Sequence, residues 1–160
     1  MVCCIPLTRG QVALVEDADA HLADRRWVAR PIGRRTGGFY AYRSEGARTV
    51  YMHRLILNAP KGALVDHING DGLDNRRANL RLATPGQNLA NRATTGRSGY
   101  RGVMNVGHPH RPWLAYICVD RRRRDIGFYA TAEEAASAYD SAASARYGEF
   151  ARLNATQQET

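Results

Sequence analysis

The sequence predicts an α+β protein made of short antiparallel strands and few helices, and two patterns in its 160 residues support this prediction. Before residue 92, short runs of β-branched and aromatic residues alternate with turn sequences, which is typical of small sheets. After residue 100, three more strand-like runs precede one segment with helical spacing. We therefore expect an N-terminal sheet region, a central motif, and a C-terminal domain with the order strand, strand, strand, helix.

The charge of the chain indicates an anionic polymer as its partner. The sequence carries 23 basic against 15 acidic side chains, a net charge of +8, and Lys61 is its only lysine. Arginine presents a planar fork of donors that suits phosphate groups, although a GC-rich coding genome would produce the same bias. With 44% hydrophobic and 24% charged residues, the chain has the composition of a globular protein.

Several classes of protein are excluded by what the sequence lacks. It has no run of 18 apolar residues, so we expect no membrane association, and Met1–Leu7 does not resemble a secretory signal. The three cysteines form no C-x-x-C pair, which argues against a disulfide framework or a zinc knuckle. We expect a cytoplasmic, non-secreted protein without a small-molecule cofactor, and the oligomeric state stays open.

The N-terminal region, residues 1–50, contains the first strand predictions. Phe39–Arg43 and Thr49–Met52 are separated by Ser44-Glu45-Gly46, as in a hairpin, and the apolar pattern continues through Leu57. This extension places His53 and Arg54 on a strand. Further strands are expected at 12–15 and 27–29.

The C-terminal part, residues 100–154, follows a linker at 93–99 and precedes a tail at 155–160. Strands are expected at 100–106, 113–119 and 125–129, with Arg121–Arg124 in the second turn. Thr131 and Glu134 form a predicted capping box in which Glu134 reaches back to the Thr131 amide. Alanines at helical spacing follow, and Gly148 is placed to end the helix.

Residues 65–84 combine a histidine with acidic and amide side chains, and they allow two metal-site interpretations. A calcium loop would place His67 at its first ligand position and Ala78 at its twelfth, so this interpretation fails. The other interpretation starts from Asp66-His67 after an apolar residue. Asn79 follows His67 by 12 residues and Asn88 follows it by 21.

A strand, a loop, a second strand and a helix would bring these four residues together. Thr84-Pro85-Gly86-Gln87 has the residue types that begin a helix, so Asn88 would lie in its opening turns. One carboxylate and one amide oxygen suit Mg²⁺ or Mn²⁺, and an imidazole can activate water. Each residue alone is also a common turn former, and only the ordered set favours a site.

The segment from about Tyr51 to Asn91 resembles the HNH (His-Me finger, ββα-metal) nucleases of the phage and intron-encoded homing type. Through this resemblance, His67 matches the general base and Asn79 the residue that orients its imidazole. Asp66 and Asn88 match the ligands of one divalent cation, Mg²⁺ or Mn²⁺. Many members of the family have a histidine at the position of Asn88. The resemblance implies an HNH motif over residues 51–92.

Residues 98–154 resemble the Apetala (ethylene-response-factor) type of DNA-binding domain. The resemblance rests on Ser98–Val103, Trp113–Ile117, Ile126–Tyr129, Thr131–Ala136 and Tyr147–Asn154. It implies that a three-stranded sheet enters the major groove, with Arg101 and Trp113 at contacting positions. Met104 and Val106 stand where this family often has arginine. The positive charge of the loops lies instead on Arg111, Arg121, Arg122, Arg123 and Arg124, which suits phosphate contacts.

Together the two resemblances imply a site-directed DNA endonuclease that acts on double-stranded DNA. Arg54 is a further candidate for phosphate contact, with a structural role as the alternative. For Arg121–Arg124, the alternative to phosphate contact is that they form a solvated turn. The rival interpretation of the whole chain is a DNA-binding regulator whose HNH motif does not cut. Neither the target sequence nor the number of strands cut follows from the sequence.

Overall fold

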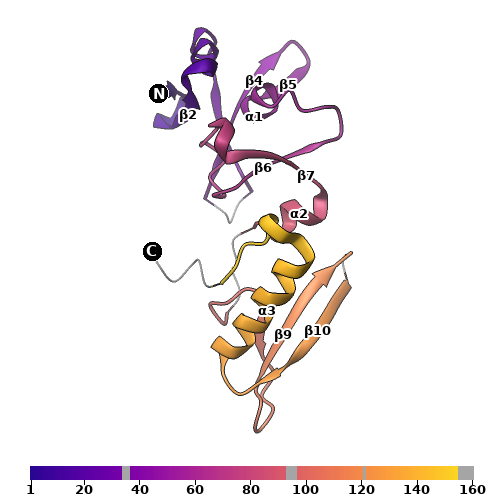
Figure 1. Cartoon of the computed structure of the whole chain (residues 1–160). Helices are drawn as coiled ribbons and strands as arrows, with labels where there is room; N and C mark the ends of the chain where they lie inside the picture. Colours follow the sequence, from indigo (N-terminus) through magenta and orange to yellow (C-terminus); the bar gives the residue numbers. More distant parts are fainter. Residues whose placement is uncertain (34–36, 93–96, 121, 155–160) are drawn as a thin grey trace. The chain divides into compact units, whose positions relative to one another are not determined.

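A computed structural model describes residues 1–33, 37–92, 97–120 and 122–154, and the chain divides into the units Met1–Thr84 and Pro85–Thr160 (Figure 1). The expectation of a mixed α/β chain with small antiparallel sheets and few helices is confirmed. Arg121, the tail at 155–160 and residues 93–96 of the predicted linker lie outside the described residues. Among the described residues, no helix is long and apolar enough to cross a membrane.

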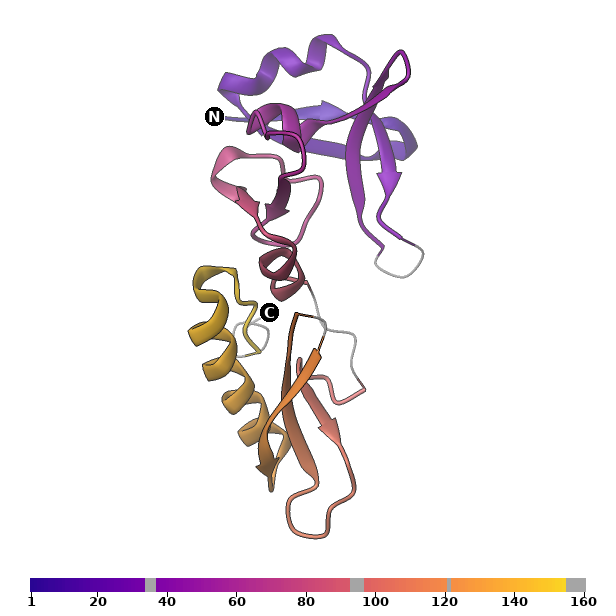
Figure 2. The ribbon, with the colours of Figure 1, turned by 90° about the vertical axis from the view of Figure 1, so that its right-hand side faces the viewer.

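The described residues of the first unit form three small sheets. Strand β1 (Val2–Pro6) pairs with β2 (Val12–Glu16), and β4 (Phe39–Glu45) lies between β3 (Val28–Pro31) and β5 (Arg48–Tyr51). Strands β6 (Leu64–His67) and β7 (Leu80–Ala83) form the third pair, and every pairing is antiparallel (Figure 2). The other elements are η1 (Thr8–Gly10), η2 (Asp17–Asp24), α1 (Met52–Ile56) and η3 (Arg77–Asn79).

One apolar core joins these sheets. Trp27 is 1% exposed, and its indole Nε1–H donates to the Leu22 carbonyl at 2.8 Å, which satisfies its polar group inside the core. The loop after β6 packs on β2, because the Leu14 amide donates to the Leu73 carbonyl and the Asn75 amide donates to the Leu14 carbonyl. The buried members of this core are Ile5, Ala13, Val15, Leu22, Trp27, Ala41, Met52, Ile56, Leu73 and Leu80.

The prediction of a strand through residues 52–57 is wrong, because this segment forms the short helix α1. Met52 and Ile56 are four residues apart and both are buried in the core. The apolar run therefore fits one face of a helix as well as it fits a buried strand, and periodicity alone does not distinguish the two. His53 and Arg54 consequently lie on α1.

The second unit packs the helix α3 (Ala132–Tyr147) against a three-stranded sheet of β8 (Val103–Asn105), β9 (Trp113–Val119) and β10 (Arg122–Tyr129), with β9 in the centre (Figure 1). The alanine pattern explains this contact, since Ala135, Ala136 and Ala143 are buried and allow a close approach. The unit also contains α2 (Pro85–Ala90) and η4 (Gly148–Phe150), and α2 packs on α3 and η4.

Two details of this unit differ from the predictions. The Thr131 hydroxyl caps α3 by accepting from the Glu134 amide at 3.2 Å, as expected, but the Glu134 carboxylate accepts from the Ala130 amide rather than from that of Thr131. Arg122, Arg123 and Arg124 belong to β10 and pair with β9, so they do not form a turn.

Candidate active site

His67 is the last residue of β6 and is buried, with 5% of its surface exposed. Its register partner is Leu80 on β7, a core residue. A turn begins directly after it, where the Gly70 amide donates to the His67 carbonyl at 2.9 Å. The strand and the turn together fix the backbone from which this imidazole projects.

The rings of Tyr40 and His53 contact the His67 ring. The ring of Tyr40 on β4 stacks on it, with centroids 5.7 Å apart, and the ring of His53 on α1 meets it edge to face at 5.1 Å. Tyr51 in turn stacks on His53 at 5.4 Å. The site is therefore built from the β4–β5 hairpin, α1 and β6, which are separated in the sequence.

The burial of both histidines favours their neutral forms. Burial, together with the charges of His67 and Arg54, lowers the pKa of His53 from 6.5 to about 3. Burial also lowers the pKa of His67. The Asn75 side chain opposes this shift, and so do the nearby carboxylates, of which Asp66 has the largest effect. At neutral pH the imidazole of His67 is thus available to accept a proton.

Asn75 is a residue of this site that the sequence analysis did not identify. It is fully buried, and its backbone amide and side-chain Nδ2 both donate to the Leu73 carbonyl, at 3.1 and 3.0 Å. These bonds hold the carboxamide while its side chain raises the pKa of His67. The Asn75 Oδ1 atom is buried without a hydrogen-bond partner among the described residues, and an acceptor of this kind near His67 is suited to stabilise the imidazolium after His67 takes a proton.

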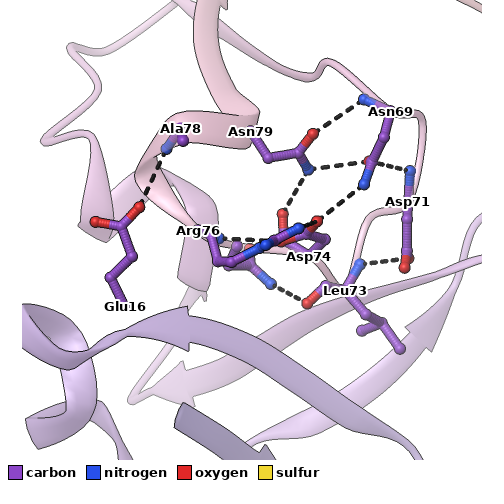
Figure 3. A network of polar contacts seen from close by, with 9 residues as sticks. Glu16, Asn69, Asp71, Leu73, Asp74, Arg76, Ala78 and Asn79 are labelled. Carbon is purple, nitrogen blue, oxygen red and sulfur yellow. Dashed lines mark hydrogen bonds and ion pairs between the residues drawn. The ribbon is translucent and has the colours of Figure 1, made fainter. Parts of the chain in front are cut away.

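Asn79 holds the loop that follows β6. Its side-chain oxygen accepts from the Asn69 amide at 3.0 Å, and its nitrogen donates to the Asn69 side chain at 3.0 Å and to the Asp74 carbonyl at 2.8 Å (Figure 3). Asn69 in turn donates to the Asp74 carboxylate, which is paired with Arg76. The bonds of the Asn79 carboxamide thus go to the loop and not to the imidazole that its side-chain oxygen was expected to hold, and an orienting role of Asn79 stays a prediction.

Asp66 forms a cross-strand pair with Arg81 inside the β6–β7 sheet. The two residues are register partners, Arg81 Nε donates to the carboxylate at 2.8 Å, and the side chains are only 5% and 12% exposed. The negative charge of Asp66 is therefore balanced within the sheet. Arg81 was not among the predicted site residues, although its place opposite Asp66 follows from the pairing of these two strands.

The two predicted metal ligands, Asp66 and Asn88, carry side-chain oxygen atoms, which are the type of ligand that a hard cation such as Mg²⁺ prefers. Among the described residues, no group of three or more histidine, cysteine or acidic side chains could hold a metal ion. Asp66 could hold a cation together with amide oxygens, water and substrate, which are oxygen ligands of the kind that Mg²⁺ prefers. Asn88, the second predicted ligand, lies on α2 in the second unit and is half-buried.

Arg54 has a structural role in the first unit. Its guanidinium donates to the carbonyls of Ala63 at 2.5 Å, Ala59 at 3.2 Å and Pro60 at 2.8 Å. These bonds close the loop between α1 and β6. These bonds support the structural alternative for Arg54, and a phosphate contact by this residue stays a prediction.

The predicted DNA-binding residues of the second unit lie in different settings. Arg101 donates to the Tyr139 hydroxyl at 2.5 Å, to the Leu89 carbonyl at 2.7 Å and to the Arg92 carbonyl, so it ties α2 to α3. Trp113 packs at the edge of the helix-facing core, whereas Arg111 is exposed in the loop before β9.

The arginines of β10 are all exposed. Arg123 is paired with Asp125 at 2.9 Å and lies over the Tyr116 ring, 5.7 Å from its centroid. Arg122 and Arg124 flank it on the same strand. Contact of these side chains with DNA stays a prediction.

Comparison with known proteins supports a nuclease. Residues 50–90, which include Asp66, His67, Asn79 and Asn88, match the HNH endonuclease family. The chain is 34% identical over 106 residues to the uncharacterized HNH endonuclease L560 of Acanthamoeba polyphaga mimivirus, covering 65% of this chain and 54% of that protein.

A second relative comes from a prophage. The chain is 35% identical over 72 residues to YosQ of Bacillus subtilis (strain 168), an SPbeta prophage-derived protein whose name describes an HNH homing endonuclease. This match covers 41% of this chain and 42% of YosQ. The chain thus spans about half the length of the curated relatives it matches.

Proposed function

We propose that this chain is a site-directed endonuclease that hydrolyses phosphodiester bonds of double-stranded DNA with a histidine general base and one divalent cation. The observation that carries the proposal is a buried His67 with a lowered pKa directly beside Asp66, within the segment that matches the HNH family. A buried neutral imidazole next to a carboxylate suits the activation of water for attack on phosphorus.

In this proposal His67 takes a proton from the attacking water. The ring packing of Tyr40 and His53 holds the imidazole in one orientation, and a neutral His53 adds no repelling charge when His67 becomes cationic. The Asn75 side chain and the Asp66 carboxylate then stabilise the imidazolium. Asn79 acts as a positioning residue by holding the loop that contains Asn75.

Asp66 and Asn88 would hold Mg²⁺ or Mn²⁺. When bound, such a cation supplies charge stabilisation for the leaving 3′ oxygen and the scissile phosphate. While no cation is bound, Arg81 balances the buried negative charge of Asp66.

The second unit would serve as the DNA-targeting part, as an Apetala-type domain. The support for this role is a three-stranded sheet covered by one helix, with exposed arginines on β10. Phosphate contacts by Arg111, Arg122, Arg123 and Arg124 would position the protein on DNA without specifying a sequence.

The experiment that tests the proposal is selection of cleaved sites from a randomised duplex DNA library in Mg²⁺ or Mn²⁺. Strand-resolved sequencing of the product ends would show whether one or both strands are cut. We expect recovery of a preferred site with cuts at a fixed position. Recovery of bound but uncut DNA in both metals would favour the regulator interpretation instead.

A further inference from the structure

A basic hollow lies in the first unit, outside the residues assigned to catalysis. Its volume is about 520 Å³, and it is lined by residues of β4 and of the segment that leads into β3. The lining residues are Arg25, Arg26, Val28, Tyr42, Arg43, Ser44 and Glu45.

The three arginines of the hollow differ in their interactions with other residues. Arg43 is held in place, because its guanidinium lies 4.8 Å from the Trp27 ring centroid and its Nε donates to Glu45 at 2.8 Å. Arg25 and Arg26 are exposed, and neither side chain bonds to another residue of the described chain. One carboxylate faces three guanidinium groups, so the hollow has a net positive charge with two arginines available to a ligand.

A path of ring contacts links one residue of the hollow to the candidate active site. Tyr42 lines the hollow, and its ring lies 6.3 Å from that of Tyr51. Tyr51 stacks on His53, which meets His67 at 5.1 Å. Three ring-to-ring steps of 5.1 to 6.3 Å therefore connect the hollow to the predicted general base.

Arg30 adds a cation along this path. It is exposed, its guanidinium donates to the Tyr51 hydroxyl at 2.9 Å, and it lies 5.7 Å from the Tyr42 ring centroid. The alternation of β4 explains the arrangement, because Tyr40 and Tyr42 share one face of the strand while Ala41 and Arg43 share the other. Arg30 thus contacts two of the tyrosines in this series of ring contacts.

We propose that the hollow is a binding subsite for a backbone phosphate of duplex DNA, a few nucleotides from the scissile phosphate. This inference rests on the proposed function, because it takes the DNA to lie along the path to His67. Guanidinium groups bind phosphate oxygens with paired donors, and a hollow that is open to solvent can admit one phosphate of a polymer. Arg25 and Arg26 are the residues assigned to the phosphate.

The experiment measures DNA binding rather than cleavage. A labelled mixed-sequence duplex is titrated in EDTA, over a range of salt concentrations, with the full-length wild type and with Arg25→Gln/Arg26→Gln. We expect the double variant to bind about tenfold more weakly near physiological salt. We also expect the plot of log K against log salt to become less steep by about 1 to 2, because up to two phosphate contacts disappear. Both side chains are exposed, so we expect an unchanged thermal midpoint.

Arg9→Gln/Lys61→Gln is the matched control, since it removes the same charge from exposed positions of the first unit outside the hollow. We expect it to change the slope by less than half as much. Equal losses in both double variants, an unchanged slope in Arg25→Gln/Arg26→Gln, or a loss that appears with duplex RNA but not with duplex DNA would overturn the inference. Cleavage by the wild type, assayed separately, reports on the proposed function, so the two failures are distinguishable.

Discussion

The imidazole rings of His53 and His67 meet edge to face, with their centroids 5.1 Å apart and their planes at 89°. One comes from α1 and the other from the end of β6, and both are buried. Two buried histidines in contact are stable together only while at most one of them is charged, because burial and mutual repulsion both oppose the second proton. This contact makes the stability of the first unit depend on pH.

The first prediction concerns this pH dependence. The pKa of His53 is about 3 in the folded chain, against an ordinary value of 6.5 for the unfolded chain. The unfolded chain therefore binds the proton first as the pH falls. The contribution of His53 to stability is therefore complete above pH 6.5 and is lost progressively between pH 6.5 and 3. We expect a loss of about 1.4 kcal/mol per pH unit from this group, measured by denaturant unfolding at a series of pH values.

His53→Gln should flatten this dependence between pH 6.5 and 5, although the variant is less stable at every pH. His21→Gln serves as the control, because His21 is exposed on η2, and it should retain the slope of the wild type. If the free energy of unfolding of His53→Gln falls with pH as steeply as that of the wild type, His53 is not buried in its neutral form.

The second prediction concerns Gly72 in the loop after β6. A Cβ atom on Gly72 would lie 2.4 Å from the Phe39 carbonyl oxygen and 2.6 Å from Cδ1 of Tyr40. The backbone oxygen cannot move aside cheaply, so we expect Gly72→Ala to lower the free energy of unfolding by about 2 kcal/mol or more. Because Tyr40 stacks on His67, cleavage should fall as well.

Gly86→Ala is the control for this substitution. Gly86 lies on α2, and the nearest atom to its Cβ would be Cε1 of Tyr147 at 3.9 Å, an ordinary contact. We expect this variant to be as stable as the wild type or slightly more stable, since alanine favours helix. Equal stability of both alanine variants in thermal melts would show that the loop does not pack on β4 as described.

The third prediction concerns Asn75 as a positioning residue. Asn75→Ala removes the side chain that favours the imidazolium form of His67 and leaves the Leu73 carbonyl without one of its donors. We expect cleavage to slow by about 10- to 100-fold with DNA binding retained, because a misplaced catalytic group costs rate rather than affinity. The ¹⁵N shifts of the His67 imidazole should change in the metal-free protein.

Asn75→Asp retains a side-chain oxygen at this position and should recover part of the rate and of the ¹⁵N shifts. A structural role alone would instead lower stability in both variants and leave the His67 shifts unmoved in the folded fraction. That outcome would remove Asn75 from the account of the site.

The strands and helices with strong local patterns could be predicted from the sequence. The helix at 132–147 has its Thr131 cap, and the runs of β2, β4 and β9 lie where the alternation of residues placed them. The segment at 52–57 was wrongly predicted as a strand, because Met52 and Ile56 satisfy a helix and a strand equally. Its conformation is decided by the core they enter, which belongs to residues distant in sequence.

The candidate site could be predicted only in part for the same reason. Asp66 and His67 follow from their motif, but Asn75 resembles any turn asparagine until its contacts with Leu14 and Leu73 are known. Arg101 has the residue type of a DNA contact, yet its guanidinium binds the Tyr139 hydroxyl inside the unit. Residue type suggests what a side chain can do, whereas long-range contacts decide what it does.

The central claim is tested most directly by cleavage of a selected DNA site in Mg²⁺ or Mn²⁺ by the wild type and by His67→Ala, with DNA binding of both measured in parallel. We expect the wild type to cut at a fixed position and His67→Ala to cut at least about 100-fold more slowly, the usual minimum contribution of a general base, while it binds the same DNA with similar affinity. Equal cleavage by His67→Ala and the wild type would contradict the assignment of His67 as the general base.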